Sequence, residues 1–281
     1  MGFNICIVGL GLMGASLAGA LEGFKNATIT GVDINEAVVQ RALDEKIVQA
    51  ATTDIYEAVK DADLLIFCVY ARHIPELLGK CVAGIKQGAA VTDICGVKAA
   101  LYKEILPLIP RNVSYVGIHP MAGKERDGIE NATPTLYQNS SMLICPTESS
   151  TDEARGLMAD MAKYIGCARI KECDYKRHDT IIAYTSDLMH IASAGLCIRY
   201  PQEMDLSFAA GAFRDCTRIA DINAEAWTEL LLENRENVLC TLDDYIKSLN
   251  HMRRAIADNN APELSELLTK AGNNKREMLK R

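Results

Sequence analysis

Three segments of this sequence carry side chains that could move protons or bind anions. In the first, residues 117–125, His119 precedes a proline in a glycine-bounded loop. In the second, His190 lies on a largely apolar helical stretch, and in the third Asp215 and Arg218 are neighbours at helical spacing. A neutral imidazole, with an ordinary pKa of about 6.5, accepts protons near neutral pH. An arginine fork grips carboxylates. The residue types therefore indicate acid–base chemistry on a small anionic molecule.

A glycine-rich turn near the N-terminus is typical of a phosphate-binding site. Gly9, Gly11 and Gly14 follow the apolar run Asn4–Val8 and open a helical pattern. In such a turn the first glycine permits the sharp bend. The second lets a pyrophosphate approach the backbone, and the third lets the helix pack closely on the strand. The helix N-terminus then offers free N–H groups to the phosphates.

Asp33 predicts which dinucleotide binds. It ends a second apolar run, 19 residues after Gly14, where a carboxylate can accept hydrogen bonds from a ribose diol. It would repel a 2′-phosphate, and no arginine follows it. The sequence therefore predicts NAD rather than NADP. The predicted cofactor contacts are Gly9, Gly11, Leu12, Met13, Gly14, Asp33 and Val69.

The elements around these residues alternate between strands and helices up to about Cys173. Strands alternating with helices such as Glu36–Asp44 predict a parallel sheet. The expected strands are Asn4–Val8, Thr28–Val32, Leu64–Val69, Ala89–Asp93, Tyr115–Gly117 and Ser141–Cys145. We therefore predict a doubly wound (Rossmann-type) α/β domain over residues 1–173.

Helical periodicity alone follows, which predicts an all-helical domain over residues 174–281. The expected helices cover Ile181–Cys197, Ala224–Leu249 and Pro262–Leu279. The first of them is apolar on two faces, and most soluble oligomers are two-fold dimers. We therefore expect a homodimer in which this domain forms the interface.

Composition narrows the class of protein further. The 281 residues are 49% hydrophobic and 24% charged, with a net charge of −7, which disfavours nucleic acid as a partner. The longest unbroken apolar run, Leu64–Ala71, is far shorter than the roughly 20 residues of a membrane span. The ten cysteines form no C-x-x-C pair and show no zinc-like spacing. We therefore expect a cytoplasmic protein with no metal site and no membrane contact.

The chain resembles the prephenate dehydrogenase family, with its related arogenate dehydrogenases, over essentially its whole length. The resemblance rests on residues 9–14, 92–98, 119–123 and 215–227. It implies NAD-dependent oxidative decarboxylation of prephenate to 4-hydroxyphenylpyruvate, a step of tyrosine biosynthesis. It also implies that His119 accepts a hydrogen bond from the substrate hydroxyl, that Arg218 grips a substrate carboxylate and that His190 binds substrate. Charged residues that gate or organise the pocket would be Glu125, Arg214 and Asp215.

Two positions depart from the family pattern. A family serine that is thought to bond the substrate hydroxyl falls on Gly96, where the backbone amide, a water or Cys95 could take its place. We keep Gly96 among the expected substrate contacts. A family histidine is replaced by Asp187, although His190 is retained.

Three alternative functions remain to be considered at this point, and the sequence disfavours the last two. The first is an arogenate dehydrogenase, in which Asp187 is a conceivable partner for the substrate ammonium, although we expect Asp187 on the helix surface. A β-hydroxyacid dehydrogenase is disfavoured, because no glycine-bounded lysine motif follows Lys171. A non-catalytic NAD-sensing dimer is disfavoured because His119, His190 and Arg218 are all present.

Overall fold

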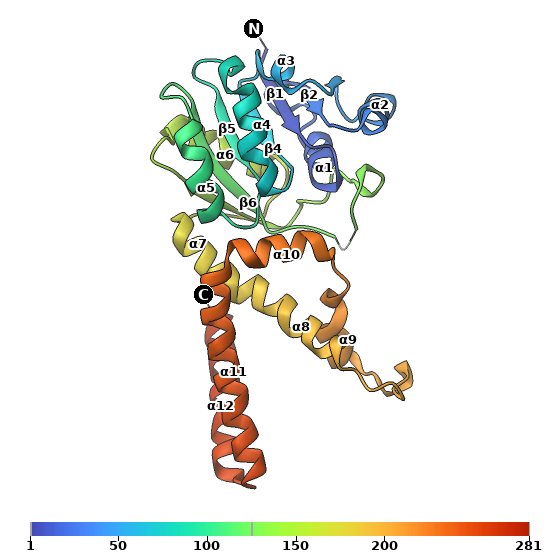
Figure 1. Cartoon of the computed structure of the whole chain (residues 1–281), viewed down its shortest axis with the longest axis vertical. Helices are drawn as coiled ribbons and strands as arrows, with labels where there is room; N and C mark the ends of the chain where they lie inside the picture. The colour runs from blue at the N-terminus through green and yellow to red at the C-terminus, as the bar shows by residue number, and fades with distance from the viewer. Residues whose placement is uncertain (1, 125, 281) are drawn as a thin grey trace. The chain divides into compact units, whose positions relative to one another are not determined.

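A computed structural model describes residues 2–124 and 126–280 and contains one sheet of eight strands within that part of the chain (Figure 1). The strand order is β3-β2-β1-β4-β5-β6-β7-β8, and only the β6–β7 pair is antiparallel. The strands are β1 (Asn4–Val8), β2 (Thr28–Val32), β3 (Ala50–Thr52), β4 (Leu64–Phe67), β5 (Ala90–Asp93), β6 (Ser114–Pro120), β7 (Ser141–Pro146) and β8 (Arg169–Glu172). The order reverses at β1, as in doubly wound sheets, and ligands bind at that switch point.

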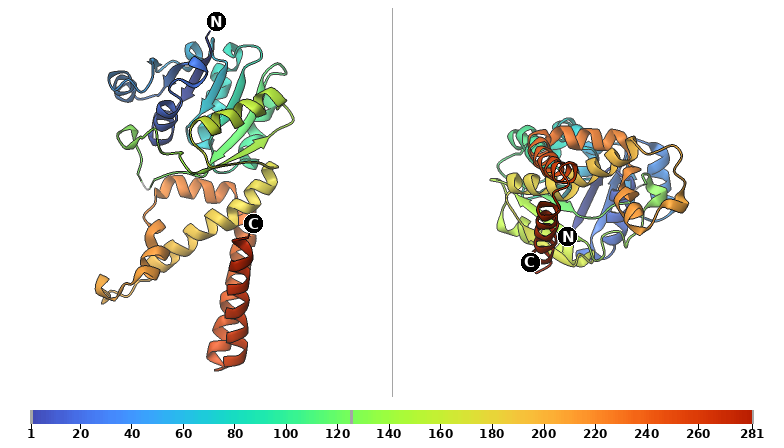
Figure 2. Two further views of the ribbon diagram at one scale, coloured as in Figure 1. Left: turned by 180° about the vertical axis from the view of Figure 1, so that it is seen from behind. Right: turned by 90° about the horizontal axis from the view of Figure 1, so that it is seen from below.

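Helices cover both faces of the sheet. One face is packed by α1 (Leu12–Ala20), α2 (Glu36–Asp44) and α6 (Asp152–Tyr164). The other is packed by α3 (Ile55–Val59), α4 (Ile74–Cys81) and α5 (Ala99–Ile105). Figure 2 shows the face that carries α6, which lies behind the sheet in Figure 1. Burial on both faces explains why the central strand β4, Leu-Leu-Ile-Phe, is apolar at every position.

The predicted doubly wound fold is confirmed, with two strands added to it. Sequence analysis missed β3 and β8, because both are short and neither contains a fully buried residue. The burial of β8, for example, is confined to Ile170, so an edge strand of this kind has no apolar run that could signal it. The strand expected over 115–117 extends from Ser114 to Pro120, which places His119 inside β6 instead of in the following loop.

The segment after β8 is helical, as expected. It contains α7 (Tyr175–Ile182), α8 (Leu188–Ile198), α9 (Gly211–Thr217), α10 (Ala224–Glu233), α11 (Arg235–Ala257) and α12 (Ala261–Met278). A π-helical turn over Ala183–Asp187 joins α7 to α8. The single helix expected over 224–249 is broken at Asn234, whose buried amide donates to the backbone oxygen of Asp179 and to Asp187 Oδ2, both at 2.9 Å.

The chain divides into two compact units, residues 1–234 and 235–281. This division falls later than the predicted boundary at 173/174, because α7 is anchored to the sheet. His178 and Asp179 of α7 are each 1% exposed, and Asp179 accepts hydrogen bonds from the backbone nitrogens that start α5. The second unit consists of α11 and α12.

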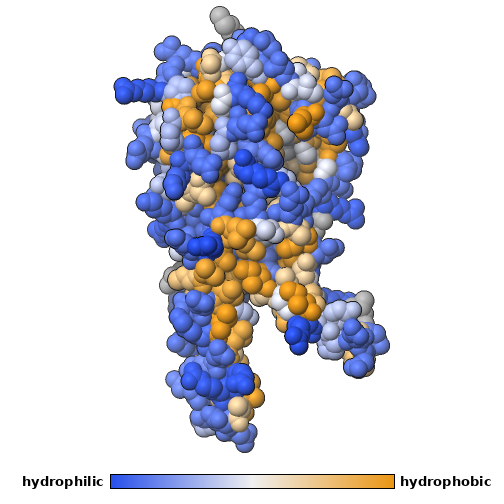
Figure 3. All heavy atoms as spheres, in the orientation of Figure 1, coloured by the Kyte–Doolittle hydropathy of each residue, from blue (hydrophilic) through white to orange (hydrophobic). Residues whose placement is uncertain are grey.

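The continuous helical stretch Tyr175–Ile198 is 24 residues long and contains an 18-residue window with a mean hydropathy of 1.4, so by length and composition it could span a membrane. Its carboxylates, Asp179 and Asp187, are buried and hydrogen-bonded within the first unit. Its exposed side chains include Ile181, Leu196 and Ile198, and Figure 3 shows hydrophobic side chains at the surface over the helices after the sheet. We interpret this apolar surface as a protein interface, because a helix that buries two carboxylates on one side is anchored in a folded domain.

Candidate active site

The glycine turn forms one wall of a cavity of about 480 Å³ at the carboxyl ends of the strands. Gly9 has a φ of +93°, and a Cβ there would lie 2.5 Å from the backbone oxygen of Cys68. A Cβ on Gly14 would lie 1.8 Å from the backbone oxygen of Gly9, so both positions require glycine. A Cβ on Gly11, in contrast, would meet nothing within 4 Å, which leaves open space beside the unsatisfied N-terminus of α1. The turn thus fits a dinucleotide pyrophosphate.

Asp33 stabilises this turn and lines the same cavity. Its carboxylate accepts hydrogen bonds from the backbone nitrogens of Leu10 and Asn35, both at 2.9 Å. Each carboxylate oxygen of Asp33 can accept a further hydrogen bond, which a ribose hydroxyl could donate. Of the predicted cofactor contacts, the structure gathers six around the cavity: Gly9, Gly11, Leu12, Met13, Asp33 and Val69. Gly14 lies behind them against Gly9 and Cys68.

A second cavity of about 830 Å³ adjoins the first, and the two share Met13, Gly123, Lys124 and Asp127. The second cavity is lined by β6 and the loop after it, by the α7–α8 stretch and by α10. Four predicted substrate residues line it: Gly96, His119, His190 and Arg218. Lys124, Arg126 and Arg218 supply positive charge to this cavity and Asp127, Asp187 and Asp221 negative charge, so its lining can pair with both anionic and cationic groups of a substrate.

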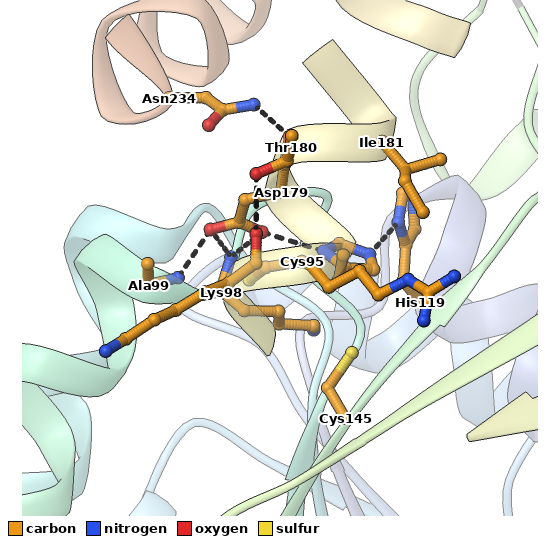
Figure 4. A network of polar contacts seen from close by, with 12 residues as sticks. Cys95, Lys98, Ala99, His119, Cys145, Asp179, Thr180, Ile181 and Asn234 are labelled. Atoms are coloured by element: carbon orange, nitrogen blue, oxygen red, sulfur yellow. Dashed lines mark hydrogen bonds and ion pairs between the residues drawn. The ribbon is translucent and has the colours of Figure 1, made fainter. Parts of the chain in front are cut away.

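His119 ends a chain of hydrogen bonds that begins at the N-terminus of α5. Asp179 accepts from the backbone nitrogens of Lys98 and Ala99, at 3.0 and 2.7 Å. The Nδ1 atom of His178 lies 2.7 Å from Asp179 Oδ1, and His178 Nε2 lies 2.9 Å from His119 Nδ1. Figure 4 shows how this network leads from Asp179 to His119.

The contacts from Asp179 through His178 to His119 indicate which ring nitrogens carry a proton. A carboxylate only accepts, so His178 donates from Nδ1 to Asp179 and offers the lone pair of Nε2 to His119. His119 then donates from Nδ1 and keeps the lone pair on Nε2, the atom nearest Gly96. Burial lowers the pKa of His119 well below its ordinary value, and the positive charge of Lys98 acts in the same direction. The cavity therefore contains a neutral imidazole that is ready to accept a hydrogen bond or a proton.

A buried ion pair lies beneath His119. The Lys98 Nζ atom is 2.5 Å from Asp93 Oδ1 and donates to the backbone oxygen of Ile118 at 2.6 Å. Tyr115 donates to the other carboxylate oxygen of Asp93 at 2.6 Å, and both charged side chains are fully buried. Burial opposes the charged form of Lys98, but Asp93 outweighs it and the pKa of Lys98 is raised. The pair ties β5 to β6 one residue before His119.

Gly96 faces His119 directly. A Cβ on Gly96 would lie 3.8 Å from His119 Nε2 and 3.2 Å from Leu230 of α10. Leu230 thus occupies the space that the family serine would need. The Cys95 thiol contacts the backbone oxygen of Val69 at 3.8 Å and lines the nucleotide cavity, not the His119 cavity. Burial raises the pKa of Cys95 well above its ordinary value, so it is a thiol at neutral pH. The backbone amide, a water and Cys95 were considered as replacements for the serine hydroxyl. Of these three, the Cys95 thiol is directed away from His119.

His190 and Trp227 form the opposite wall. Their rings are stacked with centroids 3.5 Å apart, and both line the cavity. The Nδ1 atom of His190 lies 3.0 Å from the backbone oxygen of Ser186 and therefore donates to it. Nε2 is then the acceptor in this ring.

The remaining predicted residues have different outcomes. Arg214 and Asp215 are exposed on α9 and are not among the residues that line the cavity, whereas Arg218, where α9 gives way to a 3-10 turn, lines it. Glu125 lies outside the described residues. Asp187, expected on the helix surface, is instead 2% exposed and lines the cavity. The expectation of a surface position is wrong, because Asp187 ends the π-helical turn and accepts a hydrogen bond from the buried Asn234.

Sequence analysis included Asp93 and Lys98 only within the segments 89–93 and 92–98, and it assigned no role to these two residues or to His178 and Asp179. The adjacency of His178 and Asp179 was visible in the sequence. Their link to His119, 59 residues away, depends on how α7 docks on the sheet. Spacing along the chain carries no signal for such a contact.

A dinucleotide cavity that adjoins a cavity with a poised histidine defines a nicotinamide-dependent oxidoreductase. Residues 17–171 match the family model described as prephenate dehydrogenase, nucleotide-binding domain, and residues 174–270 match prephenate dehydrogenase, dimerization domain. The chain belongs to the prephenate dehydrogenase family, and its cofactor is NAD.

Relatives and solved structures agree with this assignment. The cyclohexadienyl dehydrogenase of Zymomonas mobilis is 30% identical over 270 residues, which cover 94% of this chain and 92% of that protein. The prephenate dehydrogenase of Aquifex aeolicus, solved with hydroxyphenyl propionate and NAD+, superposes with a TM-score of 0.87 at 29% identity and covers 99% of both chains. Synechocystis arogenate dehydrogenase gives 0.84 at 28% identity and covers 98% of this chain and all of the other.

Proposed function

We propose that this protein catalyses the NAD-dependent oxidative decarboxylation of prephenate to 4-hydroxyphenylpyruvate, in the cytoplasm and as a homodimer. The observation that carries the proposal is the Asp179–His178–His119 chain, which presents an unprotonated Nε2 atom to a cavity that also contains Arg218 and lies next to the nucleotide cavity. The division at 173/174 is our proposed domain boundary. It is supported by the two family models, whose matches end at 171 and begin at 174.

The residues account for the chemistry as follows. NAD supplies the hydride acceptor. The substrate loses hydride from its hydroxyl-bearing carbon and carbon dioxide from the opposite ring carbon, and the ring becomes aromatic. The hydroxyl becomes more acidic as hydride leaves, and His119 Nε2 accepts its hydrogen bond at that moment. No net proton is released, so His119 needs only to share the proton. We assign Arg218 to a substrate carboxylate and His190 to a polar group on the same side of the cavity.

The direct test is cofactor reduction followed by absorbance, with prephenate and with arogenate, each supplied with NAD or NADP. We expect turnover with prephenate and NAD. The carboxylate of Asp33 should make NADP the poorer cofactor, because it would face the added phosphate. Absence of turnover with both substrates, in protein that still binds NAD, would contradict the proposal.

Arogenate is the second candidate substrate, because Asp187 brings a carboxylate into the cavity. Burial raises the pKa of Asp187 to about 6, although its hydrogen bond from Asn234 acts in the opposite direction and Asp179 adds to the rise. Asp187 is therefore largely ionised at neutral pH and could pair with the ammonium that distinguishes arogenate from prephenate.

We predict that Asp187→Asn lowers kcat/KM for arogenate about tenfold relative to that for prephenate, since a charged hydrogen bond contributes about 1.5–3 kcal/mol. The measurement is the ratio of the two specificity constants at pH 8, where the carboxylate is ionised. A matched control is Asp221→Asn, which changes another carboxylate on the lining of the same cavity. An unchanged ratio in Asp187→Asn would exclude Asp187 as the ammonium partner.

A further inference from the structure

A small cavity of about 150 Å³ adjoins both the nucleotide cavity and the substrate cavity. It shares Val69 and Cys95 with the nucleotide cavity and Gly96 and Leu230 with the substrate cavity. Its walls are the ends of β4 and β5 on one side and α10 on the other. The cavity is thus accessible to a group attached to the reacting end of a cofactor bound in the nucleotide cavity.

Glu233, in the last turn of α10, lines this small cavity with an unused carboxylate oxygen. Its Oε2 atom is buried and has no hydrogen-bond partner among the described residues. Glu229, one turn earlier, also lines the cavity, but it is bound by Arg72. A buried carboxylate oxygen without a donor costs about 1–3 kcal/mol or more. A hydrogen-bond donor that enters this cavity would satisfy this oxygen.

We propose that Glu233 binds the carboxamide of the nicotinamide ring, with Oε2 accepting a hydrogen bond from the amide NH₂ group. The inference rests on the NAD-dependent function proposed above and does not depend on which cyclohexadienyl substrate is used. Hydride transfer requires the nicotinamide at the junction of the two large cavities, and its carboxamide is attached next to the carbon that accepts hydride. An amide NH₂ supplies the missing donor.

The other candidates for this donor fit less well. Both carboxylates of prephenate are anionic and would be repelled by Glu233. The substrate hydroxyl already has His119 as its acceptor. Burial, with Glu104 and Asp179 adding to it and Arg72 opposing it, raises the pKa of Glu233 to about 7. The side chain is therefore a carboxylate at pH 8, when it can only accept.

The test compares the binding of two reduced cofactors by calorimetry at pH 8, with no substrate present. One is NADH, and the other is its 3-acetylpyridine analogue, in which a methyl group replaces the NH₂ group. We expect the ratio of the two dissociation constants, analogue to NADH, to be about tenfold higher in the unmodified protein than in Glu233→Ala. In Glu233→Gln the carboxylate becomes a neutral acceptor, and the ratio should fall severalfold.

Glu225→Gln, an exposed position on the same helix outside all three cavities, should keep the original ratio. Equal weakening of both cofactors in Glu233→Ala, with the ratio unchanged, would overturn the proposal and leave Glu233 a structural residue. A Glu233→Gln protein with the original ratio would overturn it as well, even if the alanine variant failed to fold. Because the assay contains no substrate, it is independent of whether prephenate is turned over.

Discussion

Replacing His119 with asparagine should lower kcat for prephenate about 10³-fold while NAD still binds. Asparagine can donate a hydrogen bond to His178 as the imidazole does. Its side chain has no basic nitrogen that could accept the proton of the substrate hydroxyl. A positioned general base typically contributes 10²–10⁴-fold. Because the side chain lies in the substrate cavity and not in the nucleotide cavity, the dissociation constant of NADH should change less than twofold. The two measurements are steady-state kcat and NADH affinity.

The pH dependence provides a second check on the same residue. The lowered pKa of His119 means that the imidazole remains neutral as the pH falls through its ordinary value of about 6.5. Activity should therefore persist at pH 6 and decline only at lower pH, where protonation removes the acceptor. A decline centred near pH 6.5, and absent in His119→Asn, would show that burial does not control this group. A kcat within tenfold of the original in His119→Asn would remove His119 from the mechanism altogether.

The parts of the fold and of the site that could be predicted from the sequence are those whose pattern lies within a short stretch of the chain. The glycine pattern of the turn at Gly9–Gly14 lies within six residues, where Gly14 packs against the backbone of Gly9, and β4 shows its burial in its own composition. His119 was found through a resemblance that includes its own loop. Edge strands such as β8 bury too little to be visible in the sequence.

The contacts that sequence analysis could not predict all cross between elements that are distant in the chain. The placement of Asp187 required knowledge of the π-helical turn, and its bond to Asn234 spans 47 residues. Glu233 appears in the sequence as one more acidic residue on an amphipathic helix. Only the packing of α10 against the strand ends shows that one of its oxygens is buried and lacks a partner.

Lys98→Met should lower the free energy of unfolding by about 3–5 kcal/mol, the usual effect of leaving one member of a buried ion pair unpartnered. Methionine fills similar volume, so the loss reflects the uncompensated charge of Asp93 and the unsatisfied oxygen of Ile118 rather than a cavity. The measurement is urea unfolding at pH 7 and fixed protein concentration, since a dimer's apparent stability depends on concentration.

The direction in which the pKa of Lys98 is shifted determines the pH range over which Lys98→Met lowers the free energy of unfolding. A lysine whose pKa is raised in the folded state contributes its full stabilisation below the unfolded value of about 10.5, and loses it only as the pH rises through the higher folded value. The loss in Lys98→Met should therefore be constant from pH 7 to 9. The double variant Lys98→Met/Asp93→Asn removes both charges and should recover part of the stability, because the penalty arises from one charge without its partner. Additive losses in the double variant would mean that the two side chains stabilise the protein independently, and that packing rather than charge pairing holds β5 and β6 together beneath His119.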